Sequence, residues 1–305
     1  MKAVESFATI TDAIHDVGHV VLLVPKHKLV YGRYVSLIEA LREWKTVCQR
    51  FDDDFEVWVE CNRALKPLEG WPYHSLTDGQ GTDDEQQVMK LIRQHKEVSP
   101  KLRLDIRSVY IFAKIAFINF AGLLFAMAEE PSRDWQQHRR FKQRISRTDS
   151  PELLQKFSSE FGHHIEWFEA QVNLYRNDFI EHPWSPTMSN LVGDSSTVRI
   201  SELIGQPLSF KDAEVLKEIA SELLEKFPEL NTVHLDLQLY QWVCRNLEHV
   251  PKTHRNTMQD MIRRIGLESG DVGQIAQRAN LAFADFIAFF GKWYKERRDK
   301  KGAPK

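Results

Sequence analysis

The residues best suited to chemistry in this sequence lie in one stretch near its middle, VNLYRNDFIEHPW, residues 172–184. An arginine fork holds phosphate oxygens and stabilises the charge that develops on them, and a histidine moves a proton near neutral pH. On RNA, a base that removes the proton of the 2′-hydroxyl group permits cleavage without a metal ion. The stretch therefore predicts Arg176 on phosphate, His182 as general acid or base, and Asn177 orienting the histidine or a phosphate oxygen.

The spacing of Arg176 and His182 limits how they can meet. Six residues of straight α-helix turn through about 600°, which leaves the two side chains about 120° apart. Pro183 disfavours the α conformation at His182, because the residue before a proline is pushed out of that region. We therefore expect the helix to end near His182, which is then free to turn toward Arg176 or toward a partner subunit.

Arg176-Asn177 followed by His182 resembles the Arg-x(4–6)-His motif of the HEPN superfamily (higher eukaryotes and prokaryotes nucleotide-binding domain), in which a polar residue usually follows the arginine. The apolar segment LDIRSVYIFAKIAFINFAGLLFAMA also resembles the opening core helix of bacterial members. The resemblance covers roughly residues 101 to 250. It implies a bundle of four or five helices, a metal-independent endoribonuclease of a toxin–antitoxin or other defence system, no cofactor, and a homodimer whose two motifs line one cleft. RNA would be the substrate, and an antitoxin a possible protein partner.

A second interpretation of the same stretch is a non-catalytic helical binding or scaffold protein. In that case the motif merely ends a helix, and Arg176 pairs with Glu181 or Glu169.

A second match to the loose pattern, RDWQQH, runs from Arg133 to His138. We prefer Arg176, which lies on a long apolar-striped helix and has Asn177 next to it and a proline stop behind it. The region around the second match predicts a basic patch that follows an RNA backbone, interleaved with Trp135 and Phe141, or else a solvated helix face. Its basic residues are Arg133, Arg139, Arg140, Lys142, Arg144 and Arg147.

Other kinds of active site are poorly supported. Glu160 and His163 have the Glu-x-x-His spacing of di-metal helical bundles, but such a centre needs a second copy and two further glutamates. Asp12, His15 and His19 have ligand-like spacing, but Gly18 is expected to end their helix, so no metal site is predicted. The sequence has no nucleophile elbow, phosphate loop or dinucleotide fingerprint.

The whole chain has 305 residues and a net charge of -2, so any basic surface must be local. Three widely spaced cysteines and the lack of an apolar N-terminal leader predict a cytoplasmic protein. Residues 109–128 are long enough to cross a membrane, but Lys114 and Asn119 interrupt them. We expect this segment to be the central helix of a bundle and expect no membrane association.

Periodicity predicts an all-α fold, a multi-helix bundle with a small β-hairpin inserted after the motif helix. Two helices are expected within residues 31–66, one from Thr82 to about His95, and another that begins at Ser99-Pro100. Residues 1–98 form an N-terminal helical region, 99–250 a HEPN-like bundle, and 251–305 amphipathic helices with a charged tail. Near the motif, one apolar stripe is a candidate dimer interface unless the core of the monomer consumes it: Phe168, Val172, Tyr175 and Phe179.

Overall fold

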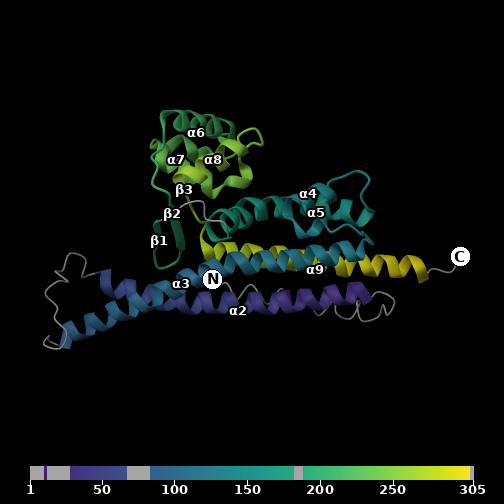
Figure 1. Ribbon diagram of the computed structural model, residues 1–305, viewed down its shortest axis with the longest axis horizontal. Coiled ribbons are helices and arrows are strands. Elements are labelled where there is room, and N and C mark those ends of the chain that lie inside the picture. Colours follow the sequence, from purple (N-terminus) through teal and green to yellow (C-terminus); the bar gives the residue numbers. More distant parts are fainter. Residues whose placement is uncertain (1–9, 12–27, 67–82, 182–187, 303–305) are drawn as a thin grey trace.

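The computed structural model describes residues 10–11, 28–66, 83–181 and 188–302. Most of these residues are helical, and one small three-stranded sheet interrupts the helices (Figure 1). The predicted all-α class with a small β insertion is confirmed.

Two long helices, α2 (Lys28–Leu65) and α3 (Asp83–Met127), lie side by side and form one layer of the molecule (Figure 1). The prediction of two helices within residues 31–66 was wrong, because α2 is continuous. The acidic run that suggested a new start, Asp52 to Asp54, lies inside the helix, and Asp52 itself is buried. The apolar stripe of Trp44 and Cys48 continues through Phe51 and Trp58, so burial favours one uninterrupted helix.

The helix α3 is also continuous, so the predicted start at Ser99-Pro100 was wrong. The Ser99 hydroxyl does not cap a new helix; it donates to the His95 carbonyl at 2.7 Å. Pro100 removes one backbone donor from the helix interior. The helix tolerates this loss because Val98, Leu102 and Ile106 are buried on both sides of it. The boundary predicted between residues 98 and 99 therefore lies within one helix.

Among the described residues, α3 is the one helix that is long and apolar enough to span a membrane. In its most apolar window, 67% of the residues are buried inside the fold. They contact α2 and the last helix, α9 (Val272–Gly302). This is the packing expected of a central bundle helix.

A second layer covers α3 and α9. It begins with η3 (Asp134–Gln136) and α4 (His138–Ile145) and continues with α5 (Glu152–Trp167). Two π-helical segments, η4 (Phe168–Asn173) and η5 (Arg176–Glu181), extend α5. Aromatic rings fill the space between the layers: Phe120 lies 4.4 Å from Phe286 between ring centroids, and Phe117 lies 4.9 Å from Phe168.

The stripe proposed as a dimer interface is part of this core. Phe168 and Val172 are fully buried, and Tyr175 and Phe179 are 1% and 7% exposed. The single chain already covers these side chains, so of the two expectations for the stripe, consumption by the core of the monomer is confirmed. Burying the stripe within the monomer removes its apolar surface from water without a partner.

The predicted hairpin is present as β1 (Met188–Gly193) and β2 (Val198–Leu203), which are antiparallel. A third strand, β3 (Gly266–Glu268), was not predicted and pairs with β2. Its pairing depends on Gly266, whose φ of +122° disfavours any side chain. Between β2 and β3 the chain forms a lobe above the sheet (Figure 1). The lobe contains α6 (Phe210–Leu223), η6 (Pro228–Thr232), α7 (Asp236–Arg245), η7 (Leu247–His249) and α8 (Arg255–Ile265).

Candidate anion-binding site around Arg176

Two of the three predicted catalytic residues open the segment η5. Asn177 is exposed, and the Arg176 side chain is 19% exposed. Arg176 donates from Nη1 to the Asn177 amide oxygen at 3.0 Å and from Nη2 to the Glu181 carboxylate. The third residue, His182, lies outside the described residues. The structure thus shows the pairing with Glu181 that the scaffold interpretation expects, and it holds the guanidinium in a fixed direction.

A buried lysine lies near this arginine. Lys114, in the middle of α3, is 5% exposed. Its ammonium nitrogen lies over the Phe117 ring, 5.4 Å from the ring centroid. Within the described ranges, the ammonium group makes no hydrogen bond or ion pair. Burial, and after it repulsion from Arg176, lower the pKa of Lys114 to about 7. The carboxylates of Glu169 and Glu181 oppose this effect and raise the pKa.

Glu169 of η4, which acts on the charge of Lys114, belongs to a group of charged residues that also includes members of α4 and α5. Lys142 bonds Glu169 at 2.9 Å and approaches Glu166 at 3.4 Å. His138, at the start of α4, has both ring nitrogens enclosed and lies 5.2 Å from the Phe117 ring. Burial lowers the pKa of His138 to about 3, with repulsion from Lys114 and Lys142 adding to the effect. The histidine of the second motif match is therefore neutral near pH 7 and enclosed by the core.

The π-helical segment before Arg176 contributes a buried amide. Asn173 is 6% exposed, and neither its oxygen nor its nitrogen has a hydrogen-bond partner in the described part of the chain. Leaving a buried amide unpaired costs about 1–3 kcal/mol, so such groups call for an explanation. π-Helical turns are rare and occur frequently at functional sites. Two such turns and an unpaired amide therefore distinguish this segment from an ordinary helix end.

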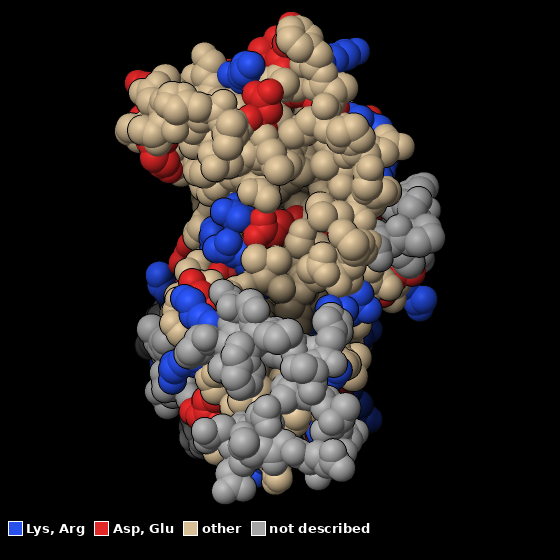
Figure 2. Space-filling view, turned by 90° about the vertical axis from the view of Figure 1, so that its left-hand side faces the viewer, with Lys and Arg blue, Asp and Glu red and all other residues tan. Residues whose placement is uncertain are grey.

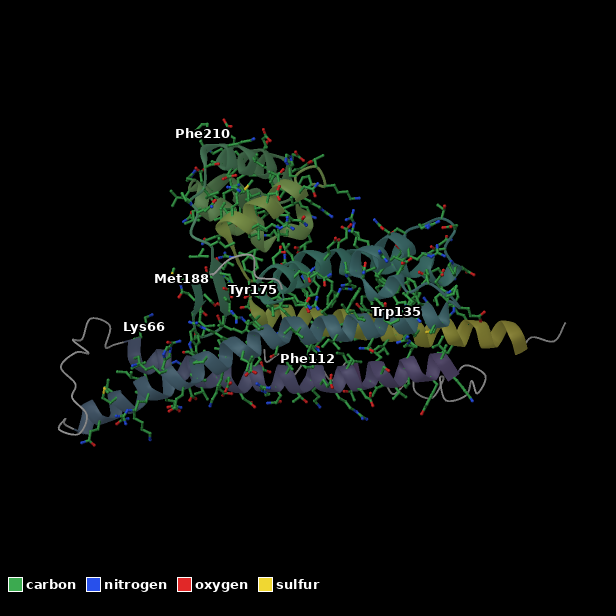
Figure 3. The ribbon with its side chains drawn as sticks, viewed as in Figure 1. Lys66, Phe112, Trp135, Tyr175, Met188 and Phe210 are labelled. Carbon is green, nitrogen blue, oxygen red and sulfur yellow. The ribbon has the colours of Figure 1, made fainter. Side chains whose placement is uncertain are left out.

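Behind Arg176, a buried carboxylate joins the motif to the sheet and to α3. Glu202 on β2 is fully buried; it accepts hydrogen bonds from the Tyr175 hydroxyl at 3.3 Å and from Arg107 at 3.2 Å. The Tyr175 ring packs 4.5 Å from the Tyr110 ring. Figure 3 shows Tyr175 where the sheet meets the helical layers. This network holds the start of η5, which contains Arg176 and Asn177, in place against β2 and α3.

The predicted basic patch divides into two groups. Arg144 bonds Glu130 and is 16% exposed, Lys142 bonds Glu169, and Arg147 bonds Asp149 at 2.8 Å. In contrast, three arginines are exposed and make no ion pair with the residues described here: Arg133, Arg139 and Arg140. Only these three leave their charge available to an external anion.

The aromatic side chains predicted to interleave with the patch are engaged within the fold. Phe141 is fully buried. Trp135 packs over Gly122 and carries the Arg33 guanidinium at 4.5 Å above its ring. It also lies well apart from Tyr175 along the long axis of the molecule (Figure 3). Trp135 is therefore separate from the Arg176 site, whereas Lys142 of the patch reaches it through Glu169.

Metal and thiol chemistry find little support in the described residues. No group of three or more His, Cys, Asp and Glu side chains there is arranged to hold a metal ion. Glu160 and His163 are both exposed on α5, while Asp12, His15 and His19 lie outside the described residues. Cys48, Cys61 and Cys244 are buried, and burial raises the pKa of each thiol, which disfavours the reactive thiolate.

The arrangement around Arg176 can bind an anion. Two cationic side chains, Arg176 and Lys114, lie close enough to repel each other, and only Arg176 has a directly bonded carboxylate. Lys114 is the residue that the sequence interpretation missed. Its signal was its position inside a continuous apolar helix, which had been treated only as an interruption of a membrane span.

Comparisons of the chain with family models, with curated proteins and with solved structures found no match.

Proposed function

We propose that this protein binds RNA and cleaves it without a metal ion, as a HEPN-like endoribonuclease. The observation that carries the proposal is the buried Lys114, whose charge Arg176 repels, beside an arginine that is itself bonded to Glu181. A phosphodiester would add a negative charge next to both cations. Its arrival also favours the protonated form of Lys114, which burial alone disfavours.

The proposed reaction starts when a base removes the proton of the 2′-hydroxyl group. The 2′-oxygen attacks the adjacent phosphorus, the bond from phosphorus to the 5′-oxygen breaks, and an acid protonates that leaving oxygen. The products are a 2′,3′-cyclic phosphate and a 5′-hydroxyl end. Arg176 stabilises the charge on the phosphate oxygens, Asn177 supports it, and His182 serves as general acid or base.

The ion pair between Arg176 and Glu181 favours a second candidate, the non-catalytic helical binding or scaffold protein. In the proposed enzyme, Glu181 holds the arginine until phosphate displaces it. In the scaffold protein, the same pair simply closes the end of the helical segment.

Cleavage of a labelled single-stranded RNA in excess EDTA separates the two candidates. The wild type should cleave it, and Arg176→Ala and His182→Ala should each lower the rate by about 100-fold or more. The matched control is Arg147→Ala, which removes an exposed arginine paired with Asp149 at 2.8 Å. Thermal melts of all four proteins check that the fold persists. Activity that survives both substitutions, or that disappears on chelation, contradicts the enzyme.

The proposal includes a homodimer in which two motifs share one cleft. Because the stripe around Phe168 is buried, the interface must use other surfaces. Mixing Arg176→Ala protein with His182→Ala protein tests the shared cleft directly. Mixed dimers should regain part of the lost activity, whereas two independent sites would regain none.

A further inference from the structure

A second cationic feature lies on α3, away from the motif. Lys96, Arg103 and Arg107 follow one another at intervals of seven and four residues, which places them on one face of the helix. The next cationic residue on that face, seven positions further on, is the buried Lys114. The face therefore leads from the exposed half of α3 toward the Arg176 site.

A cleft of about 540 Å³ opens along this face. The side chains that line it include His95, Lys96, Arg103 and Arg107, and no described acidic residue is among them. Leu104, which is 59% exposed, adds an apolar contact, and the His95 ring stacks on Trp58 at 6.3 Å. Cationic side chains beside apolar and aromatic surface are what single-stranded nucleic acids bind.

The charges of this cleft are not neutralised from within. Lys96 and Arg103 make no ion pair with any side chain that the structure describes, and Arg103 Nε is enclosed without a partner. Arg107 uses one nitrogen for Glu202 at 3.2 Å and remains 40% exposed. Figure 2, which views this end of the molecule, shows Lys and Arg side chains at the waist and at the edges of the lower half, with some Asp and Glu side chains among them.

We infer that the face of α3 bearing Lys96, Arg103 and Arg107 binds the phosphate backbone of a single RNA strand and leads it to the Arg176 site. The inference rests on the proposed RNA function but concerns binding away from the reacting phosphate. Arg107 joins the two regions through Glu202, which also accepts from Tyr175, the neighbour of Arg176. A strand on this face thus lies on the same rigid support as the motif.

The test measures the affinity of the full chain for a fluorescein-labelled single-stranded RNA by anisotropy over a salt series in EDTA. The variant is Lys96→Gln/Arg103→Gln. Arg107 is kept, because its substitution would remove the charged partner of the buried Glu202. The control is Lys90→Gln/Lys101→Gln, which removes the same charge from exposed positions more than about 100° around α3. The variant should bind about tenfold more weakly at low salt, with a salt slope smaller by about 2, while the control changes affinity less than about twofold.

Equal losses in both double variants, or unchanged affinity in the first, overturn the inference. Its failure is distinguishable from that of the enzyme. If the wild type cleaves RNA while Lys96→Gln/Arg103→Gln binds it normally, the proposed enzyme stands and the proposed role of the cleft fails. If the wild type binds RNA through the cleft but does not cleave it, the proposed role of the cleft stands and the proposed enzyme fails.

Discussion

Lys114 and Arg176 approach each other from α3 and η5, and their mutual repulsion helps to hold the pKa of the buried lysine at about 7. Two like charges brought together inside a fold are unfavourable unless an anion joins them. This relationship underlies the proposed phosphate site, and it has consequences for stability that do not depend on RNA.

The first prediction is that Lys114→Met stabilises the protein near pH 7. The folded pKa of Lys114 is about 7 and its ordinary value is 10.5, so between these values the unfolded chain binds a proton that the folded chain does not. The free energy of unfolding of the wild type therefore rises with pH across this window. The Lys114→Met protein should lack that rise, and its free energy of unfolding at neutral pH should be higher by on the order of 4 kcal/mol. Urea unfolding at pH 7, 8 and 9 measures both effects, and parallel pH profiles for the two proteins would contradict the burial of an unpaired ammonium.

The second prediction concerns the carboxylate that holds Arg176. Glu181→Gln should raise RNA affinity several-fold, because a phosphate no longer competes with a charged partner. The free energy of unfolding should fall by less than about 1 kcal/mol, since the Glu181 side chain is 38% exposed. Anisotropy titration of labelled RNA measures the affinity. Glu152→Gln, which breaks the exposed pair with Lys156 at 3.2 Å, is the control. Unchanged or weaker RNA binding by Glu181→Gln would favour the scaffold role of the pair.

The third prediction separates the two groups of the basic patch. Arg144→Gln should destabilise the protein by about 3 kcal/mol, because Glu130, which is 8% exposed, loses its charged partner. Arg139→Gln/Arg140→Gln should leave the melting temperature unchanged, since both arginines are exposed. The double variant should instead weaken RNA binding and flatten its salt dependence. Salt-independent binding by the double variant and the wild type alike would assign these arginines to a solvated face.

The fourth prediction concerns the sheet that supports Tyr175. A Cβ atom on Gly266 would lie 2.1 Å from the Glu202 carbonyl oxygen, at a φ of +122°. Gly266→Ala should therefore destabilise the protein by more than about 2 kcal/mol and disturb the strand that carries Glu202. The control is Gly32→Ala, where a Cβ meets nothing within 4 Å and helix propensity should add up to about 1 kcal/mol. Chemical denaturation of both variants tests the contrast, and equal stabilities would refute the assigned role of Gly266.

The amino-acid sequence by itself determined the class of the fold and several of its parts. The hairpin and the C-terminal amphipathic helix both appear as predicted. Such features depend on local hydrogen bonds and on periodicities that a short stretch of sequence contains. The position of Arg176 and Asn177 near the end of a long helical segment is likewise local information.

Only the tertiary structure decided where helices continue and which charges meet. Pro100 and the acidic run from Asp52 to Asp54 read locally as helix starts, yet burial of apolar stripes on both sides kept α3 and α2 continuous. Packing likewise buried the stripe that contains Phe168 and enclosed the ring nitrogens of His138. It also brought Lys114 of α3 near Arg176, which lies 62 residues further along the chain. Repulsion between two side chains depends on their separation in space, and no spacing along the sequence records that distance.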